Sequence, residues 1–79
     1  MSMQIKKDEV MANGIISVFK ANNIGVGQVL DSATILMEFK ESLDGLQMGV
    51  DWLMGKGFVL KCHNNEGCYK LTSSGHMQY

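Results

Sequence analysis

The spacing of apolar residues changes abruptly near residue 56, and this change constrains the fold more than any other feature of the sequence. Before that point, apolar residues recur at steps of three and four, as on one face of a helix: Leu43, Leu46, Val50 and Leu53. After it, two short apolar runs flank a polar turn over residues 63–67, which is typical of a β-hairpin. The pattern therefore predicts an α+β fold in which helices precede a hairpin.

Three helices and a hairpin are expected along the chain. The first helix is predicted over residues 8–22, with Met11, Ile15, Val18 and Asn22 on one stripe, and the second over 28–40. Ser42 is a good N-cap for a third helix over 42–54, whose apolar stripe should face the core. The hairpin is predicted over 58–72, followed by a short tail over 73–79.

The length of 79 residues indicates one domain, which buries only about 60% of its unfolded surface. No apolar run approaches the ~20 residues of a membrane span, and the start of the chain lacks the apolar stretch of a signal peptide. These features predict a cytoplasmic protein. In that reducing compartment Cys62 and Cys68, which flank the turn and should lie opposite each other, are expected as thiols.

Two short motifs resemble the winged helix-turn-helix of the MarR type. The first, Leu53-x-x-x-Gly57-Phe58-Val59, is similar to the end of a recognition helix, and the second, Tyr69-x-Leu71-Thr72-x-x-Gly75, to the final wing strand. The resemblance covers about residues 28–75 and implies a winged-helix domain in which 42–54 is the recognition helix and 58–72 the wing. It also implies a DNA-binding transcriptional regulator. We expect this chain to lack the long helices that dimerise that family.

The distribution of charge conflicts with DNA binding. The whole chain has a net charge of −1, and residues 28–54 carry one lysine against five acidic residues, a net −4. Carboxylates on a recognition helix repel phosphate, so affinity would depend on Lys40, Lys56, Lys61 and Lys70. A homodimer is expected under either function, and a DNA reader with so few lysines would need two half-sites to reach useful affinity.

A protein-interaction module is the alternative. The outward side of the third helix would present Met48 and Trp52 between Asp44 and Asp51, and Met and Trp are enriched at interface centres. Gly45 and Gly49 would let another backbone approach closely. Such a module would be an accessory protein or inhibitor of the kind that phages and plasmids encode. Trp52 could equally pack as core beneath the first helix. The residues expected to contact DNA or a partner are Ser42, Asp44, Gln47, Met48, Asp51, Trp52, Lys56, Lys61, Asn64, Asn65 and Lys70.

Neither catalysis nor cofactor binding is indicated. Cys62, His63, Cys68 and His76 do not follow a standard zinc spacing, and Ser73, Ser74 and His76 have no base and orienting group at useful spacing. We therefore expect no enzyme activity, no metal or cofactor, no small-molecule substrate and no membrane association.

Overall fold

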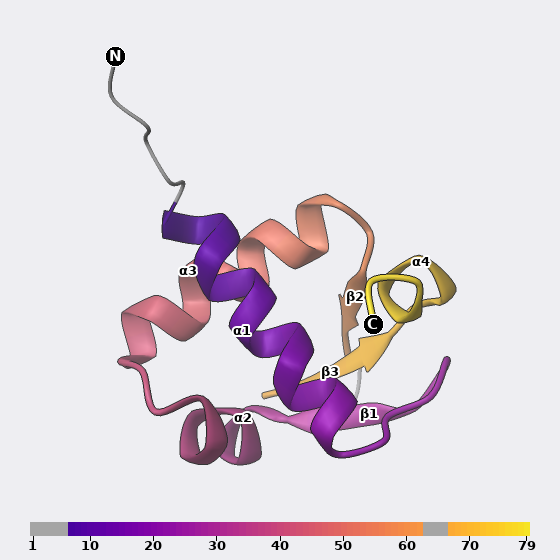
Figure 1. Ribbon diagram of the computed structural model, residues 1–79, viewed down its shortest axis with the longest axis horizontal. Coiled ribbons are helices and arrows are strands. Elements are labelled where there is room, and N and C mark those ends of the chain that lie inside the picture. Colours follow the sequence, from indigo (N-terminus) through magenta and orange to yellow (C-terminus); the bar gives the residue numbers. More distant parts are fainter. Residues whose placement is uncertain (1–6, 63–66) are drawn as a thin grey trace.

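Four helices and three short strands form the part of the chain that the computed structural model describes, residues 7–62 and 67–79 (Figure 1). In chain order they are α1 (Lys7–Ala21), β1 (Val29–Asp31), α2 (Ser32–Phe39), α3 (Leu43–Gly55), β2 (Val59–Lys61), β3 (Cys68–Leu71) and α4 (Ser73–His76). The α+β class predicted from the sequence is confirmed. None of the helices in these two ranges is both long and apolar enough to cross a membrane.

The strands form an antiparallel sheet in the order β1-β3-β2, so β3 lies in the centre. Lys70 pairs with Val29 on one side and with Leu60 on the other. The sequence predicted only the β2–β3 hairpin and placed residues 28–40 in one helix, which is wrong for 29–31. Asp31 has extended backbone dihedrals and its carboxylate accepts a hydrogen bond from the Thr34 amide (3.3 Å), so the helix begins only at Ser32.

The segment predicted as a tail contains the short helix α4. Thr72 caps this helix by accepting a hydrogen bond from the Gly75 amide (3.0 Å). Beyond it, the Tyr79 hydroxyl donates to the carbonyl of Ile24 (2.7 Å), which fastens the last residue to the segment that follows α1.

The core lies between α1, α3 and the inner face of the sheet, with Ile35 of α2 at its edge. Ile15, Phe19, Ile35, Val59 and Leu71 are completely buried, and Leu46, Val50 and Leu53 of α3 are nearly so. The prediction that Leu43 also faces inward is wrong, since its side chain is 67% exposed. Leu43 is the first residue of α3 and lies ahead of the turn, Gly45 to Gly49, that packs on α1.

Candidate binding surface

The N-terminus of α3 is fixed by its predicted cap. Ser42 lies in extended backbone, and its hydroxyl accepts a hydrogen bond from the Gly45 amide (3.1 Å). This hydroxyl satisfies an amide that has no partner within the helix, so the role the structure gives Ser42 is to start α3.

The outer face of α3 is defined here as Asp44, Gln47, Met48, Asp51 and Trp52. Both carboxylates and the Gln47 side chain are exposed, as the helical spacing predicted. The Gln47 amide nitrogen donates to an oxygen of Asp51 one turn later (2.8 Å). Because α3 itself contains no lysine, its outer face is acidic along its length.

Trp52 connects the outer face of α3 to the start of the hairpin. Its ring is half-buried and meets the ring of Phe58 edge-on, with centroids 6.0 Å apart. The ammonium nitrogen of Lys56 lies 5.3 Å from the Trp52 ring centroid, within the range of a cation–π interaction. The indole therefore packs against the edge of the core and also forms part of the surface, next to Met48, which is 37% exposed.

The lysines of the hairpin lie on opposite faces of the sheet. Side chains alternate along β2 and β3, so Lys61 is on the side of buried Val59 and Tyr69, whereas Lys70 is on the outer side with exposed Leu60. Lys61 is thus on the side of the sheet that faces α3. The two lysines do not form one cationic surface.

Asp51 brings the acidic face of α3 close to the hairpin. Burial raises the pKa of the Tyr69 phenol above 10.0, and the negative charge of Asp51 raises the same pKa further. Lys61 pairs with Tyr69 in the sheet register. The charge of Asp51 therefore acts on the phenol of the ladder pair that also contains Lys61.

Phe58 is half-buried and touches Trp52 of this surface, and Tyr69 is a core residue whose phenol is affected by the charge of Asp51; neither was expected there from the sequence. Strand alternation predicts that Tyr69 shares the inner face with Leu71, and this is the signal that could have indicated its approach to α3. Asn64 and Asn65, which were expected to make contacts from the turn, lie outside the described residues.

Gly45 and Gly49 of α3 do not form an open docking groove. A Cβ on Gly49 would lie 2.9 Å from the backbone carbon of Met11 and 3.0 Å from the backbone nitrogen of Ala12. Gly45 is also buried, beside the Met11 sulfur. Another backbone does approach these glycines closely, as predicted. It is the backbone of α1 in the same chain rather than that of a partner.

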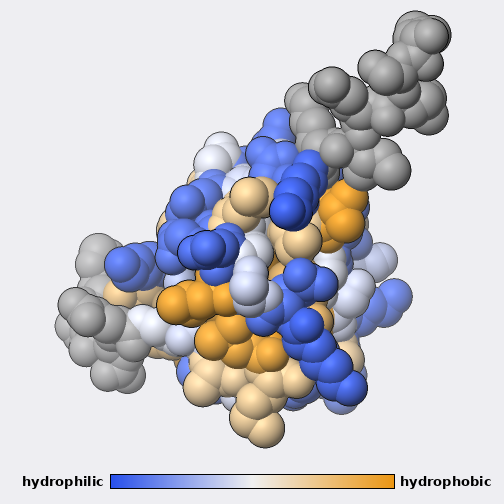
Figure 2. Space-filling view, turned by 90° about the vertical axis from the view of Figure 1, so that its left-hand side faces the viewer, coloured by the Kyte–Doolittle hydropathy of each residue, from blue (hydrophilic) through white to orange (hydrophobic). Residues whose placement is uncertain are grey.

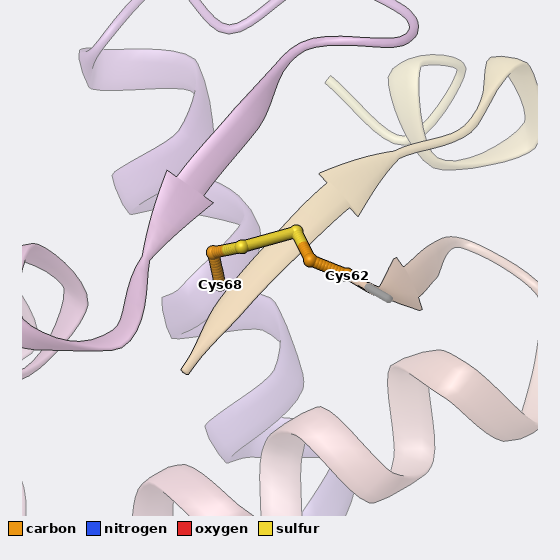
Figure 3. The surroundings of a disulfide bond; sticks show 2 residues. All are labelled: Cys62 and Cys68. Atoms are coloured by element: carbon orange, nitrogen blue, oxygen red, sulfur yellow. A yellow bond between two sulfur atoms is a disulfide. The ribbon is translucent and has the colours of Figure 1, made fainter. Parts of the chain in front are cut away.

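Cys62 and Cys68 are joined by a disulfide across the end of the hairpin (Figure 3). Their Cα atoms are 5.6 Å apart, within the usual range for a disulfide, and the Cys62 amide donates to the Cys68 carbonyl (3.1 Å). The predicted cross-strand pairing is confirmed and the expectation of two thiols is wrong. That expectation came from the presumed compartment, whereas the register of the hairpin brings the two sulfur atoms together.

A second apolar area lies over α2 and the start of α3. Figure 2 shows orange and tan atoms gathered in the lower half of the face on which α2 and the start of α3 lie. Met37 and Leu43 are the strongly exposed apolar residues of these two elements.

In the described parts of the chain, no group of three His, Cys, Asp or Glu side chains could hold a metal ion.

Comparison of the chain with protein-family models, with curated proteins and with solved structures gives no match in any of the three cases.

Proposed function

We propose that the chain is a winged-helix domain in which α3 takes the place of the recognition helix and β2–β3 that of the wing. The order of elements supports this, since a strand between the first two helices pairs with the final strand of the hairpin. The two motifs of the resemblance also meet in space. The Thr72 hydroxyl donates to the carbonyl of Gly57 (2.6 Å), and a Cβ on Gly75 would overlap the carbonyl oxygen of Phe58.

We further propose that the domain works as a protein-interaction module through the outer face of α3 and the adjoining Phe58 and Lys56. The observation that carries this proposal is the exposed pair Asp44 and Asp51 beside Met48 and Trp52 on a helix without a cation. Such a surface suits a partner segment that combines basic side chains with an apolar anchor. The carboxylates would attract the basic groups, and the half-buried Trp52 would accept the apolar one.

Binding of synthetic peptides tests the proposal directly. Trp52 is the only tryptophan of the chain, so its fluorescence reports events at this surface. We expect a peptide with four lysines and two leucines to bind, and a peptide of equal length with glutamates in place of the lysines not to bind. Affinity should fall as salt concentration rises, because exposed charges are screened.

Two double variants separate a local effect from a change in net charge. Asp44→Asn with Asp51→Asn should weaken binding of the lysine peptide at least fivefold. Glu9→Gln with Glu38→Gln removes the same two charges from α1 and α2 and should leave the affinity within twofold. Equal weakening by both pairs would mean that only overall charge matters, and failure of the lysine peptide to bind the unmodified protein would reject the interaction surface.

Duplex DNA is the second candidate partner, favoured by the order of elements and the sheet pairing. At most about four phosphates could be neutralised by Lys40, Lys56, Lys61 and Lys70, which limits the slope of log affinity against log salt to about −3.6. If DNA is the ligand, Lys61→Glu and Lys70→Glu should each weaken binding to a 20-base-pair duplex, measured by fluorescence anisotropy at low salt. No change in either variant would reject contact by the wing.

We also propose that the protein is cytoplasmic, has no enzymatic activity and forms a homodimer. Sedimentation of the protein with and without a duplex containing two half-sites would test the oligomeric state. The disulfide bears on the location, since disulfides in the cytosol are usually transient or redox-sensing.

A further inference from the structure

The disulfide occupies a specific place in the hairpin. The β2–β3 ladder pairs Val59 with Leu71, Leu60 with Lys70 and Lys61 with Tyr69. Cys62 and Cys68 are the next pair, so the disulfide closes the ladder at the end that leads into the turn. The opposite end of the ladder is held by the core, because Val59 and Leu71 are completely buried.

The two ends of the ladder therefore depend on different interactions. Packing holds the Val59–Leu71 end, and a covalent bond holds the Cys62–Cys68 end. β2 is an edge strand with three ladder pairs, so few backbone hydrogen bonds would hold its far end once the disulfide opened. Opening should loosen that end without unfolding the domain, since regions with few buried contacts open locally.

Cys62 is the more exposed of the two cysteines. Cys62 is half-buried, whereas Cys68 is 9% exposed. Both lie on the outer side of the sheet, two residues from exposed Leu60 and Lys70. A thiolate from solvent can therefore approach the Cys62 sulfur from the outer side.

The disulfide also adjoins the candidate binding surface. Lys61 precedes Cys62 and Tyr69 follows Cys68, and these two residues form the last ladder pair, on the side that faces α3. Tyr69 belongs to the same buried core as Val50 and Leu53 of α3, and the charge of Asp51 on that helix also acts on its phenol. Loosening of the end of the ladder would move Lys61 relative to Asp51.

We propose that Cys62 and Cys68 form a thiol–disulfide switch that controls binding at the outer face of α3. A thiolate of a small dithiol attacks the Cys62 sulfur and the protein disulfide breaks, which releases the Cys68 thiolate. The second thiolate of the dithiol then displaces Cys62. The dithiol leaves as a cyclic disulfide, and its two protons pass to Cys62 and Cys68. The regulatory part of this inference rests on the proposed protein-interaction function.

Hydrogen exchange tests the conformational part. The Cys62 amide donates to the Cys68 carbonyl across the ladder. The Leu71 amide donates to the carbonyl of Gln28, the residue directly before β1 (3.0 Å). We expect reduction with dithiothreitol to accelerate exchange of the Cys62 amide at least tenfold and to leave the Leu71 amide within twofold. The variant Cys62→Ser with Cys68→Ser should show the fast rate at its residue 62 with or without dithiothreitol.

Equal exchange of the Cys62 amide in both redox states would overturn the switch. Equal acceleration of the Leu71 amide would also overturn it, because the disulfide would then hold the whole domain rather than the end of the ladder. Mass spectrometry after maleimide labelling, which shows whether zero or two thiols are present, confirms the redox state of each sample.

Titration with the lysine peptide tests the regulatory part. We expect its affinity for the oxidised and reduced proteins to differ at least threefold, and the serine variant to match the reduced protein in both buffers. Binding with equal affinity to both forms would overturn the regulation and leave the proposed function standing. Binding to neither form would reject the proposed function itself, and the exchange result would still decide the conformational part.

Discussion

Asp51 lies where the acidic face of α3 meets the hairpin, and its charge disfavours ionisation of Tyr69. We expect Asp51→Asn to lower the pKa of the Tyr69 phenol. Burial, the larger cause, should still hold that pKa above 10.0. Absorbance at 295 nm measures this titration, and Tyr79→Phe leaves Tyr69 as the single tyrosine, since the chain has two.

Asp44→Asn in the same background is the matched control, because the pKa of Tyr69 has no contribution from Asp44. A shift equal to that of Asp51→Asn would contradict the placement of Asp51 beside the phenol.

The direction of the Tyr69 pKa shift also determines how the stability of the domain depends on pH. Because folding raises the pKa of Tyr69, its contribution to the free energy of unfolding is complete below pH 10.0 and is lost as pH rises through the folded pKa.

At the scale of single residues, helical spacing predicted the exposure of the outer positions of α3 but not that of Leu43, and it did not predict which residues touch. The outward positions of Asp44, Gln47 and Asp51 were predicted because residues three and four apart share a helix face. The contact of Trp52 with Phe58 could not be predicted, since it depends on how the chain turns after α3.

Among the elements, α1 and α3 pack as closely as they do because Gly49 has no side chain. We expect Gly49→Ala to destabilise the domain by roughly 1–3 kcal/mol, because the added Cβ would meet the backbone of Met11 and Ala12. Gly55→Ala is the control in the same helix, where nothing lies within 4 Å and loss of unfolded-state entropy should stabilise by about 0.4–1 kcal/mol. Urea unfolding followed by circular dichroism measures both, and equal effects would contradict the packing.

The connection between β3 and α4 depends on Thr72. Its hydroxyl donates to the Gly57 carbonyl (2.6 Å) and accepts from the Gly75 amide (3.0 Å). We expect Thr72→Val, which keeps the shape of the side chain, to lower the free energy of unfolding by about 1–3 kcal/mol because both backbone groups lose a partner. Ser74→Ala, at an exposed position of α4, should change it by less than about 0.5 kcal/mol. A smaller loss at Thr72 than at Ser74 in thermal unfolding would reject this role.

The elements that the sequence predicted well are those with a local signal. α3 has an apolar stripe and a serine cap, and the β2–β3 hairpin has two runs around a polar turn. β1 has three residues and becomes a strand only through pairing with β3, about forty residues later. Such pairing leaves no periodic pattern of its own, which is why residues 29–31 were assigned to a helix.

Across the whole molecule, charge and fold favour different ligands. The pairing of β1 with β3 and the order of elements are the basis for the proposed winged-helix domain, whereas the outer face of α3 is acidic and the hairpin lysines lie on opposite faces of the sheet. The sequence indicated this conflict through the net −4 of residues 28–54. It could not show the separation of Lys61 from Lys70, because that depends on the register of the sheet.

A single core must hold a domain of this size. About 0.05–0.15 kcal/mol per residue gives a free energy of unfolding of roughly 4–12 kcal/mol. Phe19 is completely buried, and we expect Phe19→Ala to cost about 3–5 kcal/mol, a large part of that total. The midpoint of urea unfolding should fall sharply with an unchanged slope. Met37→Ala, at a side chain that is 76% exposed, should stay within about 0.5 kcal/mol of the unmodified protein. Equal midpoints for the two variants would mean that the α1–α3 interface does not carry the stability of the domain.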